Sequence, residues 1–248
     1  MVAMPAILTL KVLSALLSYP QEETVAVASQ MRDALDREGL CVGTHREALD
    51  AFLDEFARSD LYELQERYVE LFDRSRYLSL HIFEHVHGEG RDRGQAMLDL
   101  KSLYEREGME IAANELPDFV PLFLEYCATR PLAAARELLG QPAHVFAALA
   151  ERLKKRGSSY EAVMRAILAI AAAEPRREDL DAIFSESEPD PNDLVALDAL
   201  WEEEAVTFGP GLQGSIGGCG SDALAARLRH AKRAVPTIDN PLRSGGLQ

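Results

Sequence analysis

Apolar residues in this chain recur every three or four positions, and this period constrains the fold more than any other feature. Near the N-terminus it is carried by Ile7, Leu10, Leu13 and Leu17, and Pro20 ends the stretch. Such spacing places side chains on one face of an α-helix, whereas a half-buried strand alternates with a period of two. No window of the chain shows that alternation. The sequence therefore predicts an all-α fold.

The same spacing predicts further helices along the first 173 residues. They are expected from about Val25 to Gly39, from Thr44 as N-cap to Phe56, from Asp60 to Phe72, over residues 76–87, over residues 97–108, over residues 131–156 with a break at 140–142, and over residues 159–173. Another helix begins at Pro117 or at Pro121, because two prolines four apart cannot both lie inside one undistorted helix. About eight to ten helices in a single-domain bundle are expected.

The pattern changes after Glu174. Residues 184–191 are acidic and contain two prolines, which predicts a loop, and Asn192 can cap a short helix that ends near Trp201. Residues 209–220 contain six glycines and no core positions. We therefore expect a helical domain over residues 1–205 and a flexible, Gly-rich, weakly basic C-terminal tail over residues 206–248, with a weak basic helix at 223–233.

The charge balance is strongly negative. The chain carries a formal charge of −15, and residues 221–248 contain five Lys/Arg against two Asp/Glu. Residues 1–220 therefore hold 21 basic and 39 acidic residues, a net charge of −18. Binding of nucleic acid requires the opposite sign over a large face, so no nucleic-acid partner is expected. A negative surface favours a cationic partner, because it raises the rate of encounter.

Neither export nor membrane insertion is indicated. No basic leader precedes the first apolar run, and Lys11 lies inside that run. No segment reaches the roughly 20 apolar residues that span a bilayer. The three cysteines, Cys41, Cys127 and Cys219, are far apart and suit neither a disulfide framework nor a paired-cysteine metal site. A cytoplasmic protein without direct membrane insertion is expected.

The segment between Tyr68 and Tyr126 holds the residues with possible chemistry. His81 and His85 are four apart, and Glu84 and His87 form a Glu-x-x-His motif. One reading is a helical metalloenzyme with a site at His81, Glu84, His85 and His87. Carboxylate-bridged metal sites in bundles use this motif from two helices, and the sequence contains it once. The favoured reading is that the histidines are partly buried and hydrogen-bonded, or face a protein partner.

The motif Glu115-Leu-Pro-Asp-Phe119 closes this segment and is expected to form a rim of exposed carboxylates. Its alternative role is local, because Glu115 and Asp118 precede a helix whose dipole favours negative charge at its N-terminus. No nucleophile–histidine–acid arrangement and no phosphate-binding glycine loop after a strand is present. The sequence therefore indicates no catalytic residues, no metal and no cofactor, and the chain is not expected to be an enzyme.

Three stretches carry a resemblance to a known family. They are Lys11–Pro20, Tyr68–Arg74 and, most specifically, residues 80–97 with the sequence LHIFEHVHGEGRDRGQAM. Over about residues 5–205 the chain resembles the nitrate reductase molybdenum cofactor assembly chaperones, the delta subunits of respiratory nitrate reductase. Within the wider all-helical family of molybdoenzyme chaperones, Glu115–Phe119 is similar to a Glu-x-Pro-Asp-His motif, with Phe119 in place of the histidine.

The resemblance implies a system-specific, cytoplasmic chaperone. Such a protein binds the apo catalytic (alpha) subunit of respiratory nitrate reductase, notably its N-terminal segment. It holds that subunit competent for insertion of the molybdenum cofactor and iron–sulfur clusters before membrane assembly. The residues expected to bind this client are Tyr68, Phe72, His81, Glu84, His85, His87, Arg91, Asp92, Arg93, Glu115, Pro117, Asp118 and Phe119.

Overall fold

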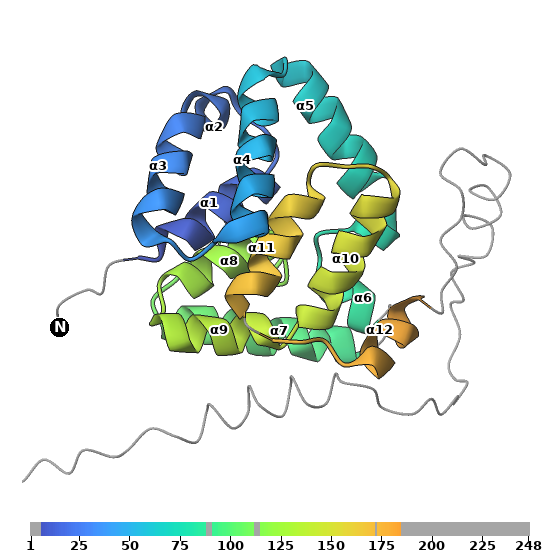
Figure 1. The fold of residues 1–248 in the computed structure, drawn as a ribbon. Coiled ribbons are helices and arrows are strands. Elements are labelled where there is room, and N and C mark those ends of the chain that lie inside the picture. The colour runs from blue at the N-terminus through green and yellow to red at the C-terminus, as the bar shows by residue number, and fades with distance from the viewer. Residues whose placement is uncertain (1–5, 88–90, 112–114, 172, 185–248) are drawn as a thin grey trace, which may run out of the picture.

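Helices pack around one apolar core in the computed structural model, which describes residues 6–87, 91–111, 115–171 and 173–184 (Figure 1). The described residues form twelve α-helices and no strand, which confirms the predicted all-α class. Ten of these helices have eight residues or more, in line with the predicted number, and α2 and α6 have only five and four. The predicted domain boundary near residue 205 and the predicted elements after Phe184 lie outside the described residues.

The elements follow one another along the chain. The first half contains α1 (Leu8–Leu17), α2 (Glu22–Ala26), α3 (Ala28–Glu38), α4 (Gly43–Arg58), α5 (Leu61–Tyr68), a π-helical turn (Val69–Asp73), a 3-10 turn (Arg76–Leu78) and α6 (Glu84–His87). The second half contains α7 (Arg91–Arg106), α8 (Val120–Ala128), α9 (Leu132–Gly140), α10 (Ala143–Lys155), α11 (Glu161–Ala171) and α12 (Arg177–Phe184). In Figure 1, α6 and α7 lie at the end of the bundle opposite the junction of α4 and α5.

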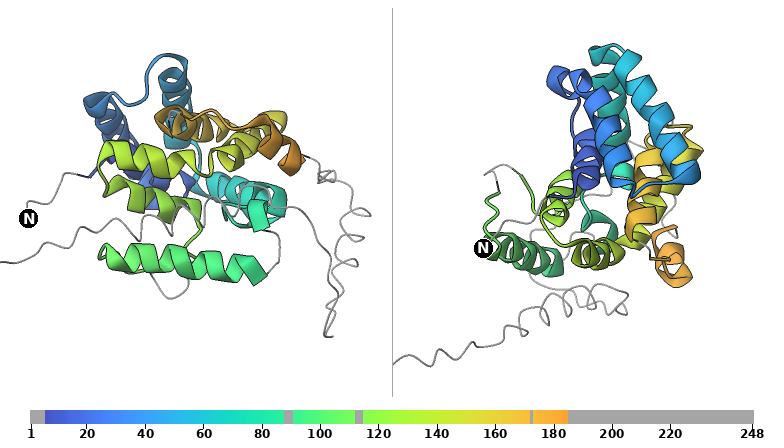
Figure 2. Two further views of the ribbon diagram at one scale, coloured as in Figure 1. Left: turned by 90° about the horizontal axis from the view of Figure 1, so that it is seen from below. Right: turned by 60° about the vertical axis from the view of Figure 1, so that its left-hand side comes forward.

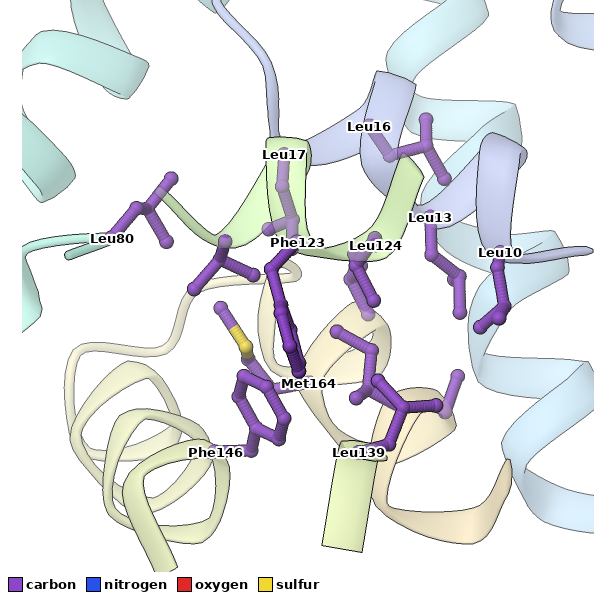
Figure 3. Packing of buried hydrophobic residues seen from close by; sticks show 14 of the residues in the cluster. Leu10, Leu13, Leu16, Leu17, Leu80, Phe123, Leu124, Leu139, Phe146 and Met164 are labelled. Atoms are coloured by element: carbon purple, nitrogen blue, oxygen red, sulfur yellow. The ribbon is translucent and has the colours of Figure 1, made fainter. Parts of the chain in front are cut away.

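Helix α1 lies at the centre of the core. It packs most extensively against α8 and also against α3 and α11. Leu10, Leu13, Leu16 and Leu17 are each fully buried, and Figure 3 shows them beside side chains of α8 and α11, including Leu124. The apolar face that the sequence predicted for this helix therefore joins the two halves of the chain.

Polar contacts fix the start of α1. The two carboxylate oxygens of Glu38 accept hydrogen bonds from the N–H groups of Leu8 and Thr9, each at 2.7 Å. These N–H groups have no acceptor within the helix, and the carboxylate supplies one. Its negative charge also interacts favourably with the positive end of the helix dipole. Further along α1, the Ser14 hydroxyl donates to the Pro121 carbonyl at 2.8 Å and links α1 to the start of α8.

Several predicted helix ends are confirmed and others are shifted. Gly39 ends α3 in the left-handed conformation with φ of 59°, and Asp60 caps α5 by accepting from the Tyr62 N–H at 2.9 Å. The prediction of Thr44 as N-cap is wrong, because α4 already begins at Gly43 and its N-cap residue is Val42. The break at residues 140–142 is confirmed as the boundary between α9 and α10. Helix α12 was not predicted.

The prediction of one helix over residues 76–87 is wrong. After the 3-10 turn the backbone is extended at Ser79, with φ of −51° and ψ of 138°, and only Glu84–His87 is α-helical. The Ser79 hydroxyl accepts from the N–H of His81 at 3.2 Å, a local bond that competes with helix formation. The intervening N–H groups bond to a distant segment, as described below.

Within the part of the chain that the structure describes, no helix is long and apolar enough to cross a membrane. Cys41 and Cys127 are buried free thiols, and burial raises the pKa of Cys41 to about 11. Both therefore act as small apolar core residues, not as reactive groups. Cys219 lies outside the described residues.

Candidate functional site

Two segments that are far apart in sequence, residues 79–85 and 115–120, cross each other next to α7. We call these two segments the crossing. The Ile82 N–H donates to the Asp118 carbonyl at 3.1 Å, and the Val120 N–H donates to the Leu80 carbonyl at 2.8 Å. His81 and Phe119 thus form an isolated antiparallel β-bridge. The bridge pairs buried backbone groups that would otherwise lack partners, and it fixes which side chains the crossing presents.

Asp118 organises the crossing from inside. Its side chain is 0% exposed, so the prediction that this carboxylate belongs to an exposed rim is wrong. One carboxylate oxygen accepts from the Phe83 N–H at 3.0 Å, and the other accepts from His81 Nδ1 at 3.1 Å. A buried carboxylate is tolerated when such donors surround it, and its hydrogen bonds are stronger than neutral ones. Glu115 is exposed as predicted.

The hydrogen bonds of the Asp118 side chain go across the crossing and not to the start of α8. Helix α8 begins at Val120, one residue before Pro121, and its N-cap residue Phe119 makes no side-chain cap bond. Pro121 fits the first turn because its missing N–H would have no helical partner there. The Asp118 carboxylate bonds to the opposite segment of the crossing, so it holds two distant segments together.

His81 and His85 have opposite electrostatic environments. The hydrogen bond to Asp118 raises the pKa of His81, although partial burial opposes this shift. Burial lowers the pKa of His85, whose Nε2 lies 2.8 Å from the Ser79 carbonyl oxygen. A carbonyl only accepts, so this Nε2 carries a proton. The prediction of partly buried, hydrogen-bonded histidines is confirmed for both residues.

We expect the stability contributed by His81 to be largest in mild acid. Its raised pKa means that the folded protein binds the proton more tightly than the unfolded chain, where a histidine pKa is near 6.5. That contribution is fully present below about pH 6.5. It is lost as the pH rises through the folded-state pKa.

Urea unfolding of the wild type and of His81→Gln checks this expectation. Other titrating groups, including His85, are present in both proteins. The difference in unfolding free energy between them should therefore shrink from about pH 6 to about pH 8. A difference that grows over this range would contradict the pairing of His81 with Asp118.

The outer side of the crossing is partly apolar and partly charged. Leu116 is 46% exposed, and the ring of Phe119, half-buried, lies 5.4 Å from the ring of His81. Glu84 forms an ion pair with Arg93 of α7 at 3.0 Å. Asp92 and Glu115 are exposed, and Pro117 is buried. The structure thus brings together seven of the predicted residues, namely His81, Glu84, His85, Arg93, Pro117, Asp118 and Phe119.

The structure describes the side chains of three of the four residues in the alternative metal-site reading, namely His81, Glu84 and His85. His81 directs Nδ1 to Asp118, and His85 directs Nε2 to a backbone carbonyl. Among the described side chains, no group of three or more His, Cys, Asp or Glu is placed to hold a metal ion. The side chains of His87 and Arg91 are outside the described part of the structure.

Tyr68 and Phe72 belong to a different part of the core. Each is 5% exposed, and the Tyr68 hydroxyl donates to the Leu17 carbonyl at 3.0 Å. Their rings form a chain of contacts with Tyr19 and Tyr160, with neighbouring centroids 5.0–5.6 Å apart. This hydrogen bond and these ring contacts are to residues outside the crossing, so the structure gives Tyr68 and Phe72 a packing role.

Sequence reasoning did not assign Ser79, Phe83 and Tyr104 to this site. The Tyr104 hydroxyl is buried and donates to the Pro117 carbonyl at 2.9 Å, which ties α7 to the crossing. Figure 2 shows that α7 otherwise lies along one edge of the bundle. The sequence did contain a signal for this contact. Tyr104 occupies a core position of a predicted helix, and a buried tyrosine hydroxyl requires a hydrogen-bond acceptor from another part of the chain.

Comparisons with known proteins match parts of the chain that include the crossing. A family model described as "Nitrate reductase delta subunit" matches residues 38–165, which include both segments of the crossing. NarJ of Escherichia coli (strain K12), named a nitrate reductase molybdenum cofactor assembly chaperone, is 38% identical over 238 residues, or 96% of this chain and 98% of NarJ. NarW of the same strain, named a probable chaperone of the same kind, is 35% identical over 242 residues, again 96% and 98%.

Among solved structures, a protein described as a redox enzyme maturation protein from Archaeoglobus fulgidus superposes with a TM-score of 0.47 and 23% sequence identity, covering 64% of this chain and 89% of that one. The two Escherichia coli relatives bear the names of assembly chaperones and not of enzymes. Because the family model spans more than half of the sequence and the similarity to NarJ runs nearly end to end in both proteins, this chain belongs to the nitrate reductase delta subunit family.

Proposed function

We propose that this protein is a dedicated chaperone for the catalytic subunit of respiratory nitrate reductase. It binds the apo subunit through that subunit's N-terminal segment. It holds the subunit competent for insertion of the molybdenum cofactor and iron–sulfur clusters. The observation that carries the proposal is the 38% identity to a named assembly chaperone over 96% of the chain.

The crossing is the surface that we assign to the client. Leu116 and the partly exposed Phe119 offer apolar area, and burial of such area supplies most of the binding energy for an amphipathic helix. Glu115, in the same segment, and Asp92, which precedes Arg93 in α7, are exposed carboxylates that we assign to the rim of this surface. In a domain with net negative charge these groups steer a basic segment towards the surface, while the apolar contacts determine how long it stays.

Asp118 supports this surface without touching the client. Its bonds to His81 and Phe83 fix the segment that bears His81 against the segment that bears Phe119. A rigid, preformed surface loses less entropy on binding than a mobile one. Asp118 therefore contributes to recognition by positioning its neighbours.

Release follows from competition between two states of the client. The chaperone binds only a catalytic subunit whose N-terminal segment is accessible. When cofactor insertion lets the subunit fold that segment away, the binding-competent state is depopulated and the complex dissociates. The chaperone needs no catalytic group and no resident cofactor for this cycle.

Co-purification from cells with and without molybdenum cofactor synthesis tests the holding step. The tagged protein is co-expressed with the catalytic subunit, and the isolated complex is analysed for molybdenum. We expect the catalytic subunit to be retained, free of molybdenum, in cells that cannot make the cofactor, and to be largely released in cells that can. Equal retention of the catalytic subunit in both strains, with molybdenum bound to it in the strain that makes the cofactor, would contradict the release mechanism, and the tag alone serves as the control.

A further inference from the structure

Helix α7 is amphipathic and packs against the bundle through one apolar face. Ala96, Leu100, Leu103 and Tyr104 are buried and belong to the common core. They lie at positions i, i+4, i+7 and i+8, so they form one stripe along the helix. Residues 91–106 hold four Lys/Arg and three Asp/Glu, a net charge of +1, whereas the whole chain carries −15. Helix α7 therefore has an apolar face and a slight positive charge, the chemistry that we assign to the client segment.

Two polar contacts of α7 end on the crossing. Arg93 forms its ion pair with Glu84 at 3.0 Å, and the Tyr104 hydroxyl donates to the Pro117 carbonyl at 2.9 Å. Both Glu84 and Pro117 belong to the segments that form the crossing. A basic segment that approaches the crossing therefore meets a carboxylate, Glu84, that is already paired with a cation of the chain itself.

The ion pairs at the two ends of α7 contribute little to its docking. Glu107, which follows α7, pairs with Arg130, which follows α8, and the side chains of this pair and of the Arg93–Glu84 pair are partly exposed. Exposed ion pairs are weak, because water and salt screen them and because ordering two long side chains costs entropy. The docking of α7 therefore depends mainly on its apolar stripe and on the Tyr104 hydrogen bond. Both are interactions that another amphipathic helix can replace.

We propose that α7 competes with the client, and that the client's N-terminal helix displaces α7 from the crossing as it binds. This inference rests on the proposed function and adds the way in which access to that surface is regulated. Only molecules with α7 undocked bind the client fully, so the measured affinity is the intrinsic affinity multiplied by the undocked fraction. A segment that lacks a comparable apolar face leaves α7 in place, and this selects against other peptides.

Two single substitutions test the competition in titration calorimetry with the N-terminal peptide of the nitrate reductase catalytic subunit. Arg93→Gln breaks the ion pair with Glu84, and Glu107→Gln breaks the ion pair with Arg130. The two changes shift the net charge in opposite directions, yet both weaken the docking of α7. We expect each to raise the affinity for the peptide by about two- to five-fold, because each increases the undocked fraction.

The matched controls are Lys101→Gln and Glu105→Gln. These two residues pair with each other at 3.8 Å, so their contact is internal to α7. The controls make the same two charge changes and should alter the affinity less than about two-fold. If Arg93→Gln and Glu107→Gln shifted the affinity in opposite directions, or no more than their controls, net charge would explain the result and the proposal would fail. Melting curves show that each variant is folded.

Hydrogen exchange of the wild-type protein, read by mass spectrometry, follows α7 directly. A helix of 16 residues is marginal in water without its packing, so a displaced α7 loses protection. With saturating peptide we expect the amides of residues 96–104 to exchange several-fold faster, and those of residues 163–170 in α11 to stay unchanged. Peptide that binds but leaves residues 96–104 unchanged or slower would overturn the displacement and leave the proposed function standing. No binding by the wild type would overturn the proposed function, and the displacement with it.

Discussion

Replacing Asp118 with alanine should lower the free energy of unfolding by about 2–4 kcal/mol. The side chain is 0% exposed and accepts hydrogen bonds from the Phe83 N–H and from His81 Nδ1. Alanine leaves the Phe83 N–H without its acceptor in a buried site, and the desolvation of that donor is then uncompensated. The loss should be seen in urea unfolding and as a decrease of roughly 5–15 °C in the melting temperature.

Two further variants separate the hydrogen bonds from the charge. Asp118→Asn keeps one oxygen that can accept from the Phe83 N–H and loses the charge that holds His81, so a smaller cost of about 1–2 kcal/mol is expected. Glu115→Ala is the matched control, because this carboxylate in the same motif is exposed, and its cost should stay within about 0.5 kcal/mol. Equal stability of Asp118→Ala and Glu115→Ala would contradict the structural role of Asp118.

The helices could be predicted because their apolar period is a local property of the sequence. In α1, Leu10, Leu13 and Leu17 lie on one face, and burying that face is enough to determine both the helix and its orientation to the core. Gly39 and Asp60 likewise act through their own backbone neighbourhood, so the ends that they mark were predicted correctly.

The crossing could not be predicted from the same kind of pattern. The apolar residues Leu78, Ile82 and Phe83 fit a helical period, and they are buried as that period implies. Their backbone is not helical, because the N–H groups of Ile82 and Phe83 bond to the carbonyl and the carboxylate of Asp118. Only the tertiary structure shows which of two possible partners a backbone N–H takes.

The candidate site was predicted in part for the same reason. Residue type correctly identified His81 as a hydrogen-bonded group and Glu115 as an exposed carboxylate. Residue type could not distinguish Glu115 from Asp118, because both are acidic residues of the same short motif. In the structure Glu115 is exposed, whereas the Asp118 side chain points inward and is buried. Tyr68 was expected to face the client, and in the structure it is a buried aromatic residue of the core.

The second large effect concerns the client. A peptide that copies the N-terminal segment of the nitrate reductase catalytic subunit should bind with a dissociation constant in the micromolar range or tighter, about −8 kcal/mol. Apolar burial should dominate, so raising the salt concentration to about 1 M should weaken binding only moderately. Leu116→Ser removes part of the apolar area at the crossing and should weaken binding roughly five-fold, which corresponds to about 1 kcal/mol.

The matched control for Leu116 lies at the opposite end of the bundle. The start of α5, which bears Tyr62, lies at the end of the bundle opposite α6 and α7 (Figure 1). Tyr62 is 79% exposed, against 46% for Leu116. Tyr62→Ser removes at least as much exposed apolar surface, yet it should leave the affinity for the peptide unchanged. If Tyr62→Ser weakened binding as much as Leu116→Ser, the loss would follow from removing apolar area anywhere on the surface, and the crossing would not be the client surface.

Titration calorimetry of the wild-type protein with this peptide tests the proposed function most directly. The proposal predicts saturable binding at one peptide per chain, with a micromolar or lower dissociation constant, and no binding of a scrambled peptide of the same composition. An absence of any saturable signal at peptide concentrations of about 100 µM, or equal binding of the scrambled peptide, would contradict recognition of the client through its N-terminal segment.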